Sequence, residues 1–81
     1  MTPDAEHTAV LRAAHRQATV PQLIARIARA GAPILEARVL EIVAELFAAD
    51  CLRCWTYEGD TYYSRKKAGS LALKAAQDVA A

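Results

Sequence analysis

The chain has 81 residues, with ten Lys or Arg against nine Asp or Glu and a net charge of +1. This length supports one small core, and the balanced charge excludes a disordered polyelectrolyte tail and a strongly basic nucleic-acid coat protein. We therefore expect a single domain over residues 1–81. The longest uncharged run has nine residues, Gln17–Ala25, so no membrane span is expected. Two cysteines are too few for a disulfide scaffold, and the expected location is the reducing cytoplasm.

The first two-thirds of the chain predicts three helices. The first covers about residues 4–17, because Asp4 and Glu6 suit a positive helix N-terminus and apolar residues recur at helical spacing behind them. The second covers about 20–30, since Thr19 and Gln22 match a capping box and Gly31 is a natural stop. The third covers about 33–49 and begins at a proline.

Residues 51–65 have a different pattern, with β-forming side chains on both sides of Gly59 and Asp60. This pattern predicts a hairpin with a Gly-first turn, in which Tyr57 lies opposite Tyr62 and Trp55 lies opposite Ser64. Either face of that hairpin closes the core equally well on sequence grounds. A short last helix over about 71–79 is predicted, with Ser70 as its N-cap.

Three helices followed by a hairpin resemble the winged helix-turn-helix domain, over about residues 5–67. The expected fold class is therefore mainly α with a C-terminal β-hairpin. Residues 19–31 look like the first helix of the turn pair, residues 32–50 like the recognition helix, and residues 51–65 like the wing. Proteins of this type and length are familiar among bacterial and phage regulators. The resemblance implies a small DNA-binding transcriptional regulator that binds duplex DNA without a cofactor.

Under this hypothesis, the basic side chains outside the third helix bind phosphates, and Arg38 is the best candidate for a base contact, with guanine. A homodimer is also expected, with Leu40 as one contact. The predicted phosphate contacts are Arg26, Arg29, Arg53, Arg65, Lys66 and Lys67.

The charge of the predicted recognition helix argues against this hypothesis, because residues 32–50 carry −3 whereas residues 19–31 and 51–70 carry +2 each. Carboxylates next to phosphates are repelled. The alternative is a winged-helix module that binds a protein, such as a phage-type inhibitor or an assembly subunit. Its surface would be the acidic helix or the aromatic hairpin face, formed by Glu36, Glu41, Glu45, Trp55, Tyr57 and Tyr62.

No catalytic or metal site is predicted. Cys51 and Cys54 form a C-x-x-C, but no second pair follows, and His7 and His15 are the only nitrogen ligands available. We interpret the cysteines as small apolar residues at the base of the hairpin. Without a recognisable nucleophile and base, an enzyme is not expected.

Overall fold

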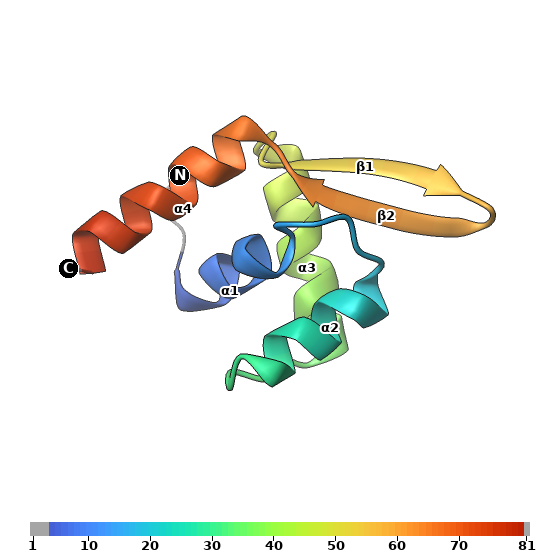
Figure 1. Ribbon diagram of the computed structural model, residues 1–81, viewed down its shortest axis with the longest axis horizontal. Coiled ribbons are helices and arrows are strands. Elements are labelled where there is room, and N and C mark those ends of the chain that lie inside the picture. Colours follow the sequence, from blue (N-terminus) through green and yellow to red (C-terminus); the bar gives the residue numbers. More distant parts are fainter. Residues whose placement is uncertain (1–3, 81) are drawn as a thin grey trace.

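The computed structural model describes residues 4–80, with the side chains of residues 4–77 (Figure 1). Three helices, α1 (Ala5–Ala13), α2 (Val20–Arg29) and α3 (Glu36–Ala48), are followed by strands β1 (Leu52–Tyr57) and β2 (Asp60–Arg65) and by helix α4 (Lys67–Ala80). The hairpin and α4 extend from the three-helix body in opposite directions, and the molecule measures 40 × 25 × 19 Å (Figure 1). Over the described residues, no helix is both long and apolar enough to cross a membrane.

Helix α1 begins as predicted, because the Asp4 side chain accepts a hydrogen bond from the His7 backbone N–H. It ends at Ala13, however, and the prediction that it continues to Gln17 is wrong. The chain instead runs beside β2: Ala18 and Tyr63 exchange two backbone hydrogen bonds, and Arg65 N–H donates to the Ala14 carbonyl. This pairing satisfies the backbone of a segment that would otherwise extend the helix.

Most of the predicted boundaries of helices α2 and α3 are confirmed. Both hydrogen bonds of the Thr19–Gln22 capping box are present, and Gly31 follows α2 with φ of 93°. Asp50 has φ of 61°, which ends α3 in a left-handed turn. The start of α3 was predicted three residues too early, because the segment after Pro33 stays extended while Ile34 packs against the core.

The hairpin forms, but its predicted register is wrong by two residues. The turn is Glu58–Gly59, with φ of 50° and 83°, so that the glycine is second rather than first. Trp55 consequently pairs with Tyr62, and Tyr57 with Asp60. Because a shift of two preserves the side-chain alternation, Trp55, Tyr57 and Tyr62 still share one face, as expected.

Helix α4 begins at Lys67, four residues before its predicted start, so Ser70 is not its N-cap. The Ser70 N–H donates to the Lys66 carbonyl within the first turn. Gly69 is buried here, and a Cβ on it would lie 2.4 Å from the Cys51 carbonyl oxygen. The absent side chain therefore lets α4 dock against the start of β1.

The core settles which face of the hairpin is buried. Leu52 is 1% exposed and Tyr63 packs against the core, whereas the Trp55 face points outward. The other core side chains come mainly from the three helices of the body. The large side chains with at most 2% exposure are Val10, Leu11, Leu23, Ile27, Val39, Ile42, Leu46 and Leu52.

One polar side chain is buried between α1 and α3. His7 lies with Nδ1 2.7 Å from the Asp4 carboxylate and with Nε2 hydrogen-bonded to Glu45. Carboxylates only accept hydrogen bonds, so both ring nitrogens donate only when His7 is protonated. Burial lowers the pKa of His7, but the hydrogen bonds to Asp4 and Glu45 outweigh it, and the net pKa is raised.

We therefore expect the protein to lose stability as the pH rises above neutrality. A raised folded-state pKa contributes stability that is fully present below the unfolded value, about 6.5, and is lost as pH rises through the folded value. The backbone hydrogen bond from His7 lowers the pKa of Asp4, so the contribution of the Asp4 carboxylate to stability is lost only at acidic pH. Thermal unfolding from pH 5 to 9 should show the alkaline loss in the wild type and not in His7→Gln; equal pH profiles would contradict this role.

Candidate nucleic-acid interface

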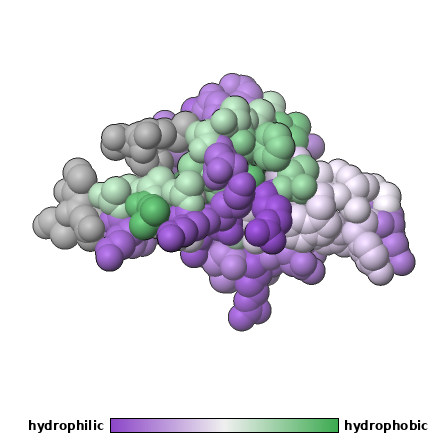
Figure 2. All heavy atoms as spheres, turned by 90° about the horizontal axis from the view of Figure 1, so that it is seen from above, coloured by the Kyte–Doolittle hydropathy of each residue, from purple (hydrophilic) through white to green (hydrophobic). Residues whose placement is uncertain are grey.

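The exposed side of α3 is apolar along its centre. Five exposed residues repeat at helical spacing and form a band that we call the α3 outer stripe: Ala37, Leu40, Ala44, Phe47 and Ala48. Leu40 is 47% exposed and Phe47 is 55% exposed. Seen from above, hydrophobic colour gathers on one side of the body (Figure 2). This stripe offers no hydrogen-bonding side chain to a base edge.

Three of the four charged residues of α3, Arg38, Glu41 and Glu45, form ion pairs on the side that faces α1. The Arg38 guanidinium lies 3.1 Å from Glu6, 3.3 Å from Glu41 and 4.0 Å from Glu45. Glu45 also bonds to His7, so that two of the three predicted acidic docking residues are already paired. A base contact by Arg38, which remains a prediction, requires this network to open.

Two of the six predicted phosphate contacts hold the end of α1. The Arg26 guanidinium donates to the carbonyls of Ala13, Arg16 and Gln17 at 2.9, 3.1 and 3.4 Å. Arg65 donates to the Leu11 carbonyl at 3.1 Å. Helix C-termini leave carbonyls without partners, and these cations supply the missing donors.

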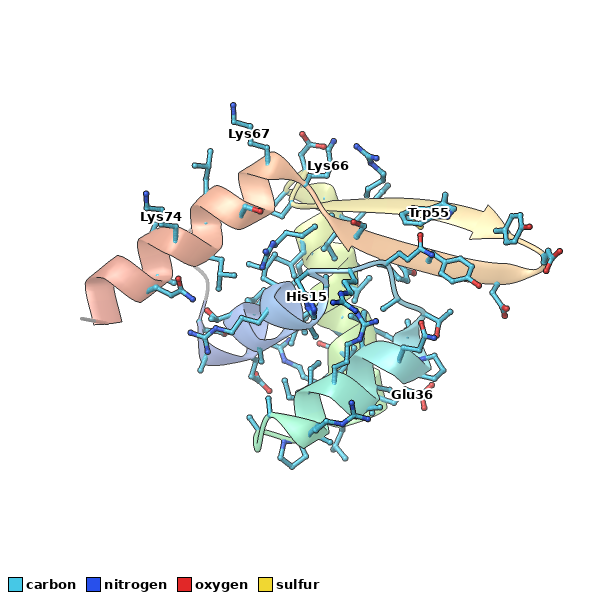
Figure 3. All side chains as sticks on the ribbon, in the orientation of Figure 1. His15, Glu36, Trp55, Lys66, Lys67 and Lys74 are labelled. Carbon is cyan, nitrogen blue, oxygen red and sulfur yellow. The ribbon has the colours of Figure 1, made fainter. Side chains whose placement is uncertain are left out.

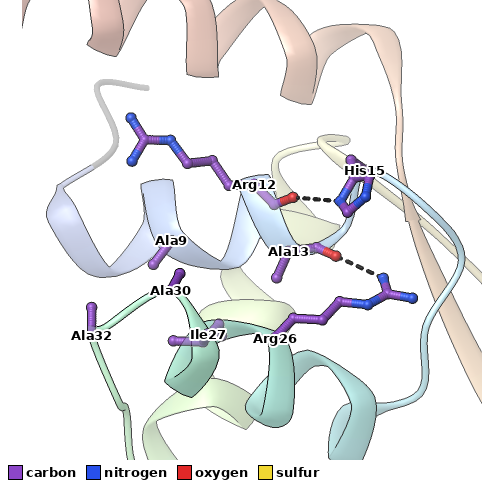
Figure 4. Close-up of a pocket in the computed structure, with 8 residues that line it drawn as sticks. All are labelled: Ala9, Arg12, Ala13, His15, Arg26, Ile27, Ala30 and Ala32. Carbon is purple, nitrogen blue, oxygen red and sulfur yellow. Dashed lines mark hydrogen bonds between the residues drawn. The ribbon is translucent and has the colours of Figure 1, made fainter.

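Figure 4 shows Arg26 reaching across the pocket between α1 and α2. This pocket of about 260 Å³ is lined largely by alanine methyl groups. Replacing Arg26 with methionine keeps the aliphatic stem and removes the donors, which should cost about 1–2 kcal/mol of stability. Arg29→Met, an exposed neighbour in the last turn of α2, should change stability by less than about 0.5 kcal/mol in the same urea titration. Equal losses of stability in the two variants would show that Arg26 does not stabilise the C-terminal end of α1.

The other four predicted phosphate contacts lie at the surface. Arg29, Arg53 and Lys67 are exposed, and no carboxylate of the described residues lies within ion-pair distance of them. Lys66 pairs with Asp50 at 2.5 Å. Figure 3 places Lys67 and Lys74 on the upper side of α4, Lys66 just before that helix, and Glu36 low in the view, near α2.

A groove crosses the outward face of the sheet, and two predicted site residues, Arg53 and Trp55, line it. Its floor is Ser64 on β2, and the α1–α2 loop and β1 border it on either side. Its volume is about 640 Å³. We call it the sheet groove; it is lined by His15, Arg16, Gln17, Arg53, Cys54, Trp55 and Ser64.

The aromatic face of the hairpin continues from this groove. Trp55 and Tyr62 stack with ring centroids 5.9 Å apart and an interplanar angle of 16°. Tyr57 is 60% exposed next to the acidic turn. The predicted set of Trp55, Tyr57 and Tyr62 is therefore brought together at the surface, with cations at its inner end.

The cysteines occupy different environments. Cys51 is buried before β1, whereas Cys54 is exposed at the edge of the sheet groove. Among the described residues, no group of three or more His, Cys, Asp or Glu side chains is placed to hold a metal ion.

Comparison with known proteins gives structural matches only, since no family model and no curated protein matches the sequence. A PadR-family transcriptional regulator from Eggerthella lenta DSM 2243 superposes with a TM-score of 0.82 at 21% identity, over 90% of this chain and 69% of its own. BpsR from Bordetella bronchiseptica, whose DNA binding is regulated by 6-hydroxynicotinic acid, superposes with a TM-score of 0.81 at 16% identity. That match covers 96% of this chain, which spans 55% of the BpsR chain. The order and packing of the elements, together with these superpositions, show that the chain has the winged-helix fold.

Proposed function

We propose that this protein is a DNA-binding winged-helix regulator. The observation that carries the proposal is the superposition of nearly the whole chain on a PadR-family transcriptional regulator and on BpsR, which is described by its regulated DNA binding. The unpaired surface cations supply a means of phosphate binding. Neither regulator exceeds 21% identity, so the similarity supports the activity through the fold and not through matched site residues.

We assign the phosphate contacts to the cations that have no structural partner. Arg29, Arg53 and Lys67 have no carboxylate within ion-pair distance among the described residues, and Lys66 gains the same freedom when it leaves Asp50. Arg26 and Arg65 stabilise the end of α1 and contribute to binding mainly by keeping the fold intact. This assignment retains four of the six predicted phosphate contacts.

The test is a salt titration of binding to mixed-sequence duplex DNA by fluorescence anisotropy. Four phosphate contacts predict roughly a hundredfold loss of affinity between about 50 and 200 mM salt. Each contact removed, as in Lys67→Ala, should reduce the slope of log affinity against log salt by about 0.9. Absence of binding at the lowest salt concentration would refute the proposal.

The α3 outer stripe favours a second candidate, a protein-binding role through self-association. An exposed apolar band on a small domain is typical of an interface, and Leu40 is one of the two large side chains in this one. Sedimentation velocity should show a dimer for the wild type and a monomer for Leu40→Glu. A wild-type monomer, or a dimer that Leu40→Glu leaves intact, would contradict it.

A further inference from the structure

We infer that the sheet groove binds a single strand of nucleic acid, with an unpaired base stacked at Trp55 and its phosphates held between Arg16 and Arg53. This inference rests on the proposed nucleic-acid function and names a surface for it that is separate from α3. Three features of the groove carry it: its shape, its charge and its aromatic end.

The shape follows from the sheet pairing. Residues 14–18 run beside β2, and β2 pairs with β1, so that three chain segments lie side by side. Ser64 lies on the middle segment opposite Arg53 and has a short side chain between two longer ones. The groove therefore has a low floor and raised basic walls, which suits an extended strand better than a compact ligand.

The charge of the groove is of one sign. Arg16 and Arg53 are exposed on its opposite walls, and no acidic residue of the described chain is among its lining residues. His15 lies beside Arg16 in the sequence, and its Nδ1 donates a hydrogen bond to the Arg12 carbonyl (Figure 4). In contrast, the hairpin turn carries Glu58 and the α3 outer stripe carries no cation. The groove thus presents cations to a phosphate without an opposing charge on its walls.

The aromatic end explains why an unpaired base is favoured over a duplex. The Trp55 indole borders the groove and rests on Tyr62, which holds its ring plane in place. A base can stack on such a plane only when its own face is free, as in a single strand. A positively charged track that ends at a fixed aromatic ring is the usual arrangement for strand binding without sequence preference.

Trp55 is the only tryptophan of the chain, and its fluorescence reports stacking directly. Titration of the full chain with a thymidine 15-mer should quench this emission to saturation, and added salt should reverse the quenching. Arg16→Ala/Arg53→Ala should weaken binding at least tenfold, while the matched variant Arg12→Ala/Lys74→Ala, with the same charge change outside the groove, should bind as the wild type does. Ser64→Tyr, which fills the floor without removing a cation, should also abolish quenching.

A Trp55 variant gives an independent measurement by anisotropy. Loss of base stacking in Trp55→Ser should weaken strand binding by about 5- to 150-fold. Trp55→Tyr retains an aromatic plane and should restore most of the affinity, which separates stacking from a folding defect. Duplex binding without strand-induced quenching would overturn this inference and leave the proposed function standing. No binding of strand or duplex at low salt would overturn both.

Discussion

Alanine in place of Leu11 is expected to lower the free energy of unfolding by about 2–5 kcal/mol. Leu11 is fully buried in α1, the helix that contacts α2, α3 and α4, so its loss leaves a cavity where the four helices meet. A domain of this size has a total stability of about 5–10 kcal/mol, so the variant should lose a large share of it. Urea denaturation followed by circular dichroism measures the change.

Leu40→Ala provides the matched control, because the same atoms are removed from a side chain that is 47% exposed. Its expected loss is under about 1 kcal/mol. A larger loss at Leu40 than at Leu11 would contradict the assignment of core and surface on which the α3 outer stripe depends.

Gly69→Ala is the second substitution with a large expected effect. Its change in the free energy of unfolding should have the opposite sign to that of most Gly-to-Ala replacements in helices. Alanine normally stabilises a helix interior by up to about 1 kcal/mol over glycine. At Gly69, the added Cβ would lie 2.4 Å from the Cys51 carbonyl oxygen and 3.1 Å from a Leu11 methyl group. Moving α4 away from β1 should make the net effect a loss of about 1–3 kcal/mol.

The neighbouring Ala68→Gly variant tests the ordinary propensity effect at an exposed position of the same turn. The free energy of unfolding of this variant should fall by no more than about 1 kcal/mol. If Gly69→Ala were more stable than the wild type in the same urea titration, this result would contradict the close approach of α4 to β1.

Elements with local signals were predicted well, and those that depend on distant pairing were not. The Thr19–Gln22 box and Gly31 lie next to the ends that they define, and the boundaries of α2 were correct. The end of α1 depends on hydrogen bonds from Ala18 to Tyr63, 45 positions away, which no local pattern indicates. The hairpin register failed for a smaller reason, because Gly59 was given the first turn position instead of the second.

The candidate site divides in the same way, between features that have a local sequence signal and features that depend on distant contacts. The grouping of Trp55, Tyr57 and Tyr62 on one face was predicted because alternation along a strand survives a shift of two residues, whereas the sequence left open which face is buried. The structural roles of Arg26 and Arg65 were missed, since nothing in the sequence shows that their donors meet the carbonyls at the end of α1. Arg53 and Trp55, which line the sheet groove, were predicted as site residues, whereas Arg16 on its other wall was missed. Residues 1–18 sum to zero charge, although the acids lie at the start of that segment and Arg16 near its end.

The central claim is that nucleic acid binds the sheet side of this fold and not α3. The most direct test is a ¹⁵N-NMR titration at low salt with short DNA, first single-stranded and then duplex. We predict that amide shifts concentrate in residues 15–17, 53–55 and 64–67, with a further shift at Arg29 when duplex is added, and that Glu36–Ala48 changes little. Shifts concentrated along α3, or no shifts with either DNA, would contradict the claim.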